Sequence, residues 1–514
     1  MSRRTPTDLD EYSAPEGGVP RMAGGVQIAS EEKRVDYRRL LAMLAGILGF
    51  VIVVALPDVP DAVDPQGQIF SLDRQGRFAI GLFVLAAIWW VFEVLPVGVT
   101  AIAIGVIQAL FQIRDARAAF TDFMDPSVWF IVGALTIGMA FARSGLTNRI
   151  AYRMLALVGE RASMIYFGCF VMTAGLTLVM AHSAVAPAVF PLLAVIHSIY
   201  SDDGQPTRFG KGLFIGMAFT AGAGSIITLF GAARGAVAIG FYRDLVGREI
   251  TFFELSYYML PVGVVMIVLL WLYLLSAYPP EKKTIPGLKQ RARHLHSTLG
   301  PLSGREWLTI LLTLAAVVAM SLRSLVPWLG AIDKSAILLT ATVLFFVFGC
   351  LRLRDLESLP LNIILLFGGA MSIGFCLWQT GAAQWLAIHW LNSLPTDSPF
   401  MFVVGLTAFV LIMTNLIMNV AAIAISMPVA LAIAPYLGVA PEVVLFASLA
   451  AAGMPFLALV GAAPNAIAYQ SKMFSAFEFF RAGLIPSVGL VVVIALFVWK
   501  IWPWMGMPTT LPAS

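Results

Sequence analysis

The chain has 514 residues, of which 59% are hydrophobic and 12% charged, with a formal net charge of +4. A soluble chain of this length carries about 25% charged residues, so most of this one has no water to face. The small, scattered charge argues against nucleic-acid binding, and three cysteines in separate apolar segments (Cys169, Cys350 and Cys376) indicate neither a disulfide framework nor a metal cluster.

Residues 1–36 are polar and rich in Pro, Gly and charge, which predicts a disordered cytoplasmic tail. Beyond the tail, apolar runs long enough to cross a bilayer follow one another, and each crossing needs about 20 helical residues. The runs do not alternate like barrel strands, so they predict helices. We expect spans near 40–56, 78–95, 97–112, 126–142, 163–197, 212–242, 255–277, 307–326, 335–350, 360–378, 400–436, 440–471 and 482–502.

Three of these spans, 163–197, 400–436 and 440–471, are too long for one crossing and contain Gly or Pro. Such segments form re-entrant hairpins or broken helices, which a membrane protein tolerates where protein or a cavity surrounds them. We interpret the first two as hairpins. The predicted fold class is therefore an all-α membrane protein with about eleven transmembrane helices plus two re-entrant hairpins.

Lysine and arginine predict the orientation, because they gather in cytoplasmic loops. They are frequent just before the first span and in the loops 143–161, 278–306 and 351–359, whereas 381–399 has none. All the basic segments lie on one side if each hairpin enters and leaves from the same side. This predicts an integral protein of the inner (plasma) membrane with a cytoplasmic N-terminus and an external C-terminus.

The two halves of the chain share a pattern of residues displaced by about 235 positions. The matching markers are Gly133, Gly138 and Gly145 with Gly369, Gly374 and Gly381; Pro191 with Pro428; and Gly231-Ala232-Ala233 with Gly461-Ala462-Ala463. The basic loop follows the opening helix of the first copy but precedes that of the second, which indicates two inverted-topology repeats. Inverted repeats with broken helices place a binding site near the bilayer midplane and serve alternating access.

These patterns predict the domain organisation. It comprises a cytoplasmic tail (1–36), a first half (37–277) with repeat 1 at 126–277, a cytoplasmic linker (278–306), a second half (307–505) with repeat 2 at 360–502, and a C-terminal tail (506–514).

Three motifs carry a resemblance to a known family. They are Trp90-Val91-Phe92-Glu93-Val94-Leu95-Pro96 with Thr100-Ala101, Gly368-Gly369 after Pro360, and Gly461-Ala462-Ala463-Pro464-Asn465-Ala466. Together they resemble the divalent anion:sodium symporter family of dicarboxylate, citrate and sulfate carriers, over about residues 78 to 500. The third motif lacks one proline of the family's Gly-x-Pro-Pro-Asn loop. The resemblance implies a homodimer whose transport domains move as rigid bodies, an elevator mechanism.

The family places Ser-Asn-Thr at each hairpin tip, with the Ser ten residues before a proline, and these tips bind substrate carboxylates and help to coordinate sodium. Counting back from Pro191 and Pro428 reaches Ala181-His182-Ser183 and Met418-Asn419-Val420, so both tips depart from the pattern. Sodium prefers several hard oxygen ligands, as other hard cations do. The loss of side-chain oxygens puts sodium coupling in doubt.

Arg234 stands where the family's first Gly-x-Pro-Pro-Asn loop has a proline. An arginine inside the membrane is costly and usually functional. Our hypothesis is that Arg234, with His182, supplies fixed positive charge where the family uses sodium. The alternatives are that Arg234 snorkels or pairs with Asp244, that His182 only caps a helix, and that Asn465 caps its loop.

We therefore predict a secondary active transporter of small anions, favouring a dicarboxylate over sulfate or a sulfonate. The alternatives are proton coupling or anion exchange and, further off, an anion channel; no motif points to an enzyme. Expected partners are the anion, the bilayer and a second copy of the chain, with a possible sodium ion in place of any cofactor. The predicted substrate-binding residues are His182, Ser183, Arg234, Asn419, Val420 and Asn465; those for cation coupling are His182, Asn419, Gly461, Ala462 and Asn465.

Overall fold

The computed structural model describes residues 37–56, 59–63, 68–92, 94–201, 205–323, 326–393, 398–416, 418–459 and 461–511. The predicted tail, 1–36, and Glu93 of the first family motif lie outside these residues. The described chain is nearly all helical, and its one small sheet pairs β1 (Ala62–Val63) antiparallel with β2 (Ile69–Phe70), with Ala62 opposite Phe70.

The helices of the first half are α1 (Tyr37–Ala55), α2 (Arg74–Val91), α3 (Val97–Leu110), α4 (Ala116–Thr121), η1 (Asp122–Met124), α5 (Pro126–Ser144), α6 (Leu146–Val158), α7 (Ala162–Leu176), α8 (His182–Tyr200), α9 (Arg208–Gly224), α10 (Ala233–Val246) and α11 (Phe252–Ala277). Those of the linker and second half are α12 (Leu288–Thr298), α13 (Gly304–Leu322), α14 (Pro327–Gly330), α15 (Lys334–Val347), α16 (Leu353–Glu357), α17 (Leu361–Gln379), α18 (Ala382–Ser393), α19 (Pro399–Leu416), α20 (Asn419–Ile433), η2 (Ala434–Leu437), α21 (Pro441–Ala452), α22 (Ala463–Tyr469), α23 (Ala476–Leu496), η3 (Phe497–Ile501) and α24 (Trp502–Trp504).

Local chemistry explains where many of these helices begin and end. The side chains of Asp73, Asp125 and Asp333 accept hydrogen bonds from the first-turn N–H groups of α2, α5 and α15. Gly145 and Gly381 follow α5 and α17 with φ of +88° and +69°, a backbone conformation that favours glycine. These two glycines therefore stop two helices of equal length at matching points of the two halves.

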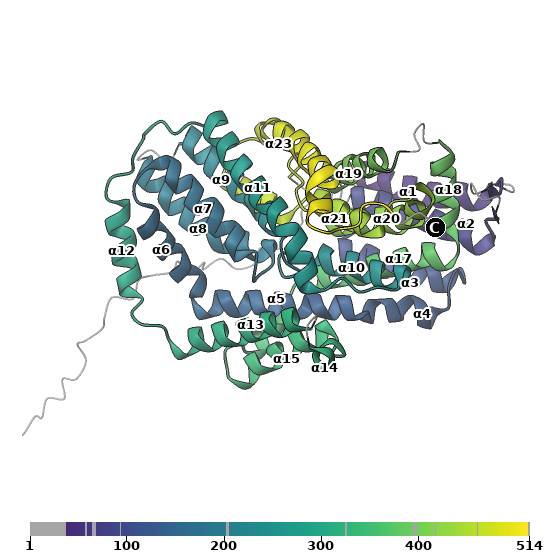
Figure 1. Cartoon of the computed structure of the whole chain (residues 1–514), viewed down its shortest axis with the longest axis horizontal. Coiled ribbons are helices and arrows are strands. Elements are labelled where there is room, and N and C mark those ends of the chain that lie inside the picture. The colour runs from purple at the N-terminus through teal and green to yellow at the C-terminus, as the bar shows by residue number, and fades with distance from the viewer. Residues whose placement is uncertain are drawn as a thin grey trace, which may run out of the picture.

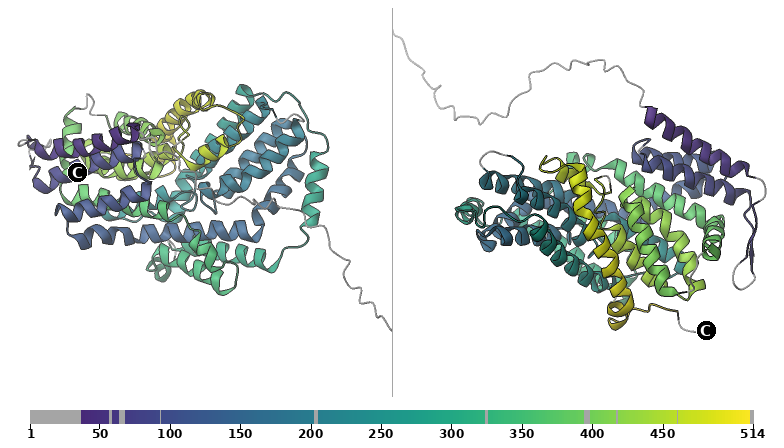
Figure 2. Two further views of the ribbon diagram at one scale, coloured as in Figure 1. Left: turned by 180° about the vertical axis from the view of Figure 1, so that it is seen from behind. Right: turned by 90° about the horizontal axis from the view of Figure 1, so that it is seen from above.

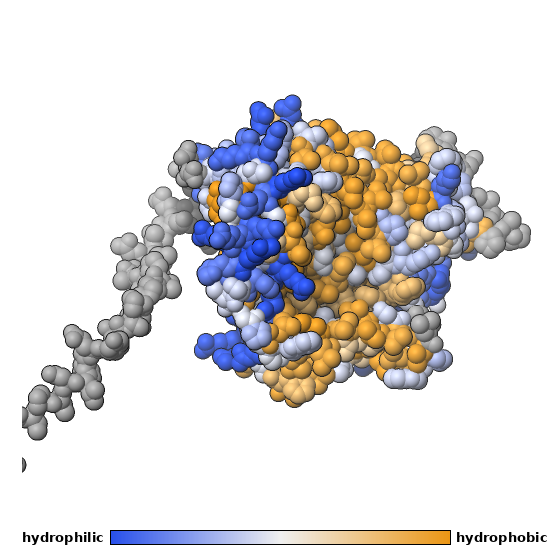
Figure 3. Space-filling view, turned by 60° about the vertical axis from the view of Figure 1, so that its left-hand side comes forward, coloured by the Kyte–Doolittle hydropathy of each residue, from blue (hydrophilic) through white to orange (hydrophobic). Residues whose placement is uncertain are grey.

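The membrane class predicted from composition is confirmed. Eight helices of the described chain are long and apolar enough to cross a bilayer. The space-filling view shows a broad apolar surface next to hydrophilic residues gathered at one end of the molecule (Figure 3). That distribution fits a protein whose middle faces lipid and whose ends face water.

Three segments predicted to be loops contain helices instead. The basic segments 143–161 and 278–306 hold α6 and α12, and 381–399 holds α18. Helix α6 buries Leu146, Ala151 and Leu155 along one face, so it is amphipathic rather than uniformly apolar. These helices are too short to form the long apolar runs by which the spans were predicted.

Both hairpins form where the proline spacing predicts them. Helices α7 and α8 are separated by residues 177–181, and α19 and α20 by residues 417–418. The N-cap residues of α8 and α20 are Ala181 and Met418, the positions reached by counting back from Pro191 and Pro428. Each proline lies inside the second helix of its hairpin, where it removes one backbone hydrogen bond.

A second pair of breaks interrupts the following segments. Residues 225–232 separate α9 from α10, and residues 453–462 separate α21 from α22. We name the first stretch loop 1 and the second loop 2. In each half, therefore, a hairpin is followed by a broken helix.

Segments of the two halves that are far apart in the sequence lie side by side, as α5 does with α13 and α15 (Figures 1 and 2). Helix α3 of the first half packs against α17 of the second, and α15 of the second packs against α5 of the first. Helix α10 packs against α20, and α22 packs against α8. This exchange brings both hairpins and both broken helices to the centre of the molecule.

The predicted C-terminal tail is anchored over its described part, 506–511. Thr510 forms an antiparallel bridge with Val439, and the N–H of Leu511 donates to the carbonyl of Gly438 at 2.8 Å. The chain end therefore packs on the turn between η2 and α21.

The close packing of α23 on loop 2 gives a stability test. A Cβ at Gly483 would lie 1.9 Å from the backbone oxygen of Phe456, whereas one at Gly489 on the same helix would meet nothing within 4 Å. We expect Gly483→Ala to cost about 1–3 kcal/mol or more, through backbone displacement. Gly489→Ala should leave stability unchanged or raise it by up to about 1 kcal/mol. Thermal unfolding midpoints in detergent measure both, and equal midpoints would contradict this packing.

Candidate functional site

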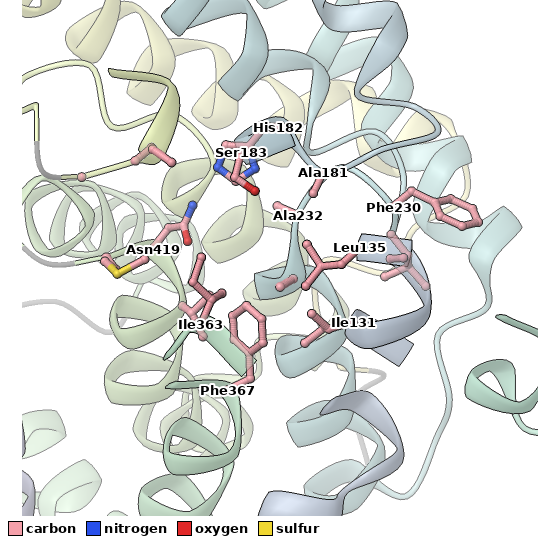
Figure 4. Close-up of a pocket in the computed structure, with 18 residues that line it drawn as sticks. Ile131, Leu135, Ala181, His182, Ser183, Phe230, Ala232, Ile363, Phe367 and Asn419 are labelled. Atoms are coloured by element: carbon pink, nitrogen blue, oxygen red, sulfur yellow. The ribbon is translucent and has the colours of Figure 1, made fainter. Parts of the chain in front are cut away.

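A cavity lies where the four breaks meet, with about 640 Å³ of empty volume, partly open to solvent. Its residues come from both hairpin tips, both loops, α5 and α17 (Figure 4). They are Ile131, Ala134, Leu135, Ala181, His182, Ser183, Leu229, Phe230, Ala232, Ala233, Ile363, Phe367, Met418, Asn419, Val420, Gly461, Ala462 and Ala463.

The polar and apolar residues occupy different walls of this cavity. His182, Ser183 and Asn419 lie next to one another in this view, while Ile363, Phe367, Leu135 and Ile131 form an apolar wall below and beside them (Figure 4). A ligand with both polar and apolar parts matches this division.

The N-termini of α8, α10 and α20 all point into the cavity region, since each contributes its first residues to the lining. Their N-cap residues are Ala181, Ala232 and Met418, and none of these makes a side-chain capping bond in the described structure. Uncapped N-termini present backbone N–H groups and the positive end of the helix dipole. The arrangement favours a bound anion.

The first tip is tied to loop 1 through the carbonyl of Gly231. That carbonyl accepts from the backbone N–H of His182 at 2.9 Å and contacts His182 Nδ1 at 3.0 Å. A carbonyl can only accept, so Nδ1 carries the proton and Nε2 is the ring nitrogen able to contact a ligand. Thr228 Oγ1 adds a second tie by donating to the carbonyl of Leu178 at 3.0 Å.

Two buried asparagines hold loop 2: Asn415 of α19 ties it to the second hairpin, and Asn465 ties it to α22. Asn415 Oδ1 accepts from the N–H groups of Leu457 and Ala458 at 2.7 and 3.2 Å. Asn465 Nδ2 donates to the carbonyls of Pro455 and Ala458 at 2.8 and 2.9 Å. Four backbone groups of loop 2 are thus satisfied from both sides, as a break inside the membrane requires.

Arg234 lies behind the cavity lining, not in it. It is 1% exposed, its Nη2 donates to Ser225 Oγ at 2.8 Å, and its Nη1 has no hydrogen-bond partner among the described residues. Gly453 lies against the guanidinium, since a Cβ there would be 2.7 Å from Nη2. No described carboxylate forms a salt bridge with Arg234, and Asp244 pairs with Arg243 instead. A buried charge left without a partner costs several kcal/mol, about the penalty of desolvating one ion.

A vestibule with about 870 Å³ of empty volume adjoins the cavity. It is lined by Arg39, Leu95, Pro96, Val97, Asn362, Ile363 and Met418, and the last two also line the cavity. The two hollows therefore meet at Ile363 and Met418, and the vestibule reaches the start of α1 at Arg39.

The predicted site residues separate into two groups. His182, Ser183, Asn419, Val420, Gly461 and Ala462 line the cavity, whereas Arg234 and Asn465 lie outside its lining. Sequence reasoning missed Asn415 and the apolar wall. Asn415 carried a signal, because an amide inside an apolar span needs buried partners, but the apolar wall looks like any other part of a span.

The side-chain oxygens near loop 1 are already engaged. Thr220 and Ser225 donate to the carbonyls of Gly216 and Gly222, and Thr228 donates to that of Leu178. Ser225 Oγ, which also accepts from Arg234, faces a positive charge. A sodium ion at this point would be repelled by the guanidinium, so the residues around loop 1 do not favour a cation there.

A helical membrane protein with broken helices around a central anion-attracting cavity has the features of a carrier. A family model described as the sodium:sulfate symporter transmembrane region matches residues 38–508. The chain belongs to this family. It is accordingly a secondary transporter of anions and not an enzyme.

Two relatives of this chain match it over nearly their whole length. The sodium-dependent dicarboxylate transporter SdcS of Staphylococcus saprophyticus is 23% identical over 504 residues, covering 94% of this chain and 95% of that protein. SdcS of Staphylococcus aureus (strain bovine RF122 / ET3-1) is 24% identical over 496 residues, covering 92% and 93%.

Two solved transporters share the fold. The YdaH transporter of Alcanivorax borkumensis has a TM-score of 0.51 at 14% identity, covering 92% of this chain and 98% of that one. MtrF of Neisseria gonorrhoeae, described among antimetabolite efflux pumps, has a TM-score of 0.55 at 13% identity, covering 93% and 96%. At these identities the likeness concerns architecture alone.

The opposite hydrogen-bonding roles of the two loop 2 asparagines give a prediction. Asn465→Asp would set a carboxylate against two carbonyl oxygens. Asn415→Asp keeps both bonds that its oxygen accepts and meets one carbonyl, that of Leu411, to which Asn415 Nδ2 donates at 2.7 Å. We expect Asn465→Asp to lower the unfolding midpoint far more than Asn415→Asp, because a buried charge facing like dipoles costs several kcal/mol. Thermal unfolding in detergent is the measurement, and the reverse order would refute the assignment of roles.

Proposed function

We propose that the protein carries small dicarboxylates across the inner (plasma) membrane by alternating access. The observation that carries this proposal is the meeting of three uncapped helix N-termini, those of α8, α10 and α20, at one cavity. Each N-terminus stabilises a negative charge by about 0.3–1 kcal/mol or more when partly buried. Asn419, Ser183 and His182 add side-chain hydrogen-bonding groups.

The shape of the cavity favours a dicarboxylate over sulfate or a sulfonate. His182 and Asn419 come from different hairpins, so each can receive one carboxylate (Figure 4). The apolar wall formed by Ile363 and Phe367 would contact the methylene groups between them. The relatives described as dicarboxylate transporters support this choice.

Alternating access is supported by the reciprocal packing of the two halves. We propose that they contain two inverted-topology repeats, at 126–277 and 360–502, and that the hairpins and broken helices move together as an elevator. In this proposal the N-terminus is cytoplasmic, the C-terminus is external and the chain forms a homodimer. The vestibule near Arg39 then opens to the cytoplasm.

Uptake into proteoliposomes tests the function. Labelled succinate, sulfate and taurine are compared, with and without sodium and with and without a pH gradient. We expect saturable succinate uptake that exceeds uptake of the other two. Absence of uptake of all three would overturn the proposal, and flux that never saturates would indicate a channel.

The role of Asn419 gives a second test. Asn419→Ala removes an amide placed to bind a carboxylate, and a hydrogen bond to a charged group contributes about 1.5–3 kcal/mol. We expect the KM for succinate to rise about tenfold or more, with protein yield unchanged. Asn392→Ala, in α18, is the control and should leave the KM unchanged. An unchanged KM in Asn419→Ala would show that Asn419 does not bind the substrate.

Arg234 supports a proposal about coupling. A guanidinium held beside Ser225, with one nitrogen unpartnered, supplies permanently the positive charge that a co-transported cation would bring. We propose that transport in this chain needs less sodium than in the relatives named as sodium-dependent, with proton coupling or anion exchange supplying the driving force. His182, through Nε2, is the residue able to exchange a proton at the site.

Substitution of Arg234 tests this coupling. Arg234→Gln should abolish sodium-free uptake of succinate, because the cavity loses its nearby fixed charge. Arg234→Lys, which keeps the charge, should retain part of it. The same uptake assay is run for both variants after their folding is checked by size-exclusion chromatography. An unchanged KM and rate in Arg234→Gln, or strict sodium dependence of the unsubstituted chain, would contradict the proposal.

A further inference from the structure

A second cavity lies away from the anion site, between α6, α8 and α12, with about 580 Å³ of empty volume. Its lining is mainly apolar, and the residues with polar side chains are Asn148, Tyr152 and Arg291. The other residues are Ala151, Leu155, Ala188, Pro191, Leu192, Val195, Ile199, Leu288, Ala292 and Leu295. An apolar cavity of this kind suits a hydrocarbon chain better than a polar solute.

The cavity opens at the surface. Val195 lines it and is 43% exposed, and Arg291 and Asn148 are exposed as well. Helix α12 lies across α6, with Leu288 and Ala292 buried beneath it. Arg291 lies one turn along from Leu288 and at the edge of the cavity, so a molecule inside it can reach this guanidinium.

The surface around the opening is strongly basic. The segment 282–305 contains six Lys or Arg residues and no Asp or Glu; they are Lys282, Lys283, Lys289, Arg291, Arg293 and Arg305. Hydrophilic residues gather at this end of the molecule, beside the broad apolar surface (Figure 3). A basic, amphipathic helix at the border between polar and apolar surface is typical of contact with anionic lipid.

We propose that this cavity binds an anionic phospholipid, with one acyl chain between α6, α8 and α12 and the phosphate on Arg291. The charge of the segment 282–305 complements the anionic headgroup, and the apolar lining complements the chain. Arginine binds a phosphate through paired, charge-assisted hydrogen bonds. The proposal uses the membrane location of the chain and holds whatever anion it transports.

The lipid would act on the hairpin that reaches the anion site. Helix α8 begins at His182 in the anion site and lines the lipid cavity at Ala188, Pro191 and Val195. On the other side of the cavity, α6 is attached to the end of the linker. Arg149 of α6 donates to the Glu306 carboxylate at 2.7 Å and to the carbonyl of Gly300 at 2.8 Å. A lipid in this cavity therefore braces the first hairpin against the linker and regulates its movement.

Lipid retention tests the proposal without any transport measurement. The full chain is reconstituted into vesicles of phosphatidylcholine with or without phosphatidylglycerol, extracted in mild detergent and analysed by native mass spectrometry. We expect phosphatidylglycerol to be retained in preference to phosphatidylcholine. Arg291→Gln should lower that retention about fivefold or more, while Arg293→Gln, an exposed neighbour outside the lining, should leave it unchanged.

A second pair of variants distinguishes lipid binding inside the cavity from lipid attraction by general surface charge. Ala188→Phe would fill the cavity from α8, whereas Ala194→Phe adds the same volume on the exposed side of that helix. Retention should fall in the first and persist in the second. Equal retention of the two lipids, or equal loss in Arg291→Gln and Arg293→Gln, would overturn the proposal. Retention undiminished in a folded Ala188→Phe variant would do so as well.

Discussion

Backbone groups inside a membrane must find partners within the protein, and this constraint shapes the centre of the molecule. The described chain interrupts its helices at two hairpin tips and two loops, which exposes N–H and carbonyl groups at that depth. The breaks satisfy one another: Gly231 accepts from His182, and Asn415 and Asn465 hold loop 2. The contacts that make the breaks tolerable also bring the tips to one cavity.

The electrostatics of the cavity follow from the same breaks. Helices α8, α10 and α20 begin there without side-chain caps in the described structure, so their positive ends are left for a ligand. Arg234 adds a full charge behind them, held by Ser225. Since no described carboxylate pairs with it, the region carries an excess of positive potential that only a bound anion would offset.

Helix α8 links the chemistry at the centre to the surface of the protein. One end begins at the anion site and the other lies against α6 and α12 at the basic end of the molecule. Pro191, within the second of these regions, removes one backbone hydrogen bond, which gives the helix a point of weaker bonding. A lipid at the basic end and an anion at the tip would therefore act on one continuous element.

Hydropathy alone determined that the chain is a helical membrane protein, because burial from water is a local property that a sequence expresses directly. The spacing of tip and proline in the family that the chain resembles located the breaks at Ala181 and Met418. Sequence patterns did not reveal α6 and α12, whose apolar faces are short, or the partners of Arg234, Asn415 and Asn465. Asn415 meets backbone groups 42 and 43 residues further along the chain, and Arg234 lies against Gly453 of the other half. No local rule predicts contacts between such distant segments, and so only the tertiary structure placed Arg234 behind the site.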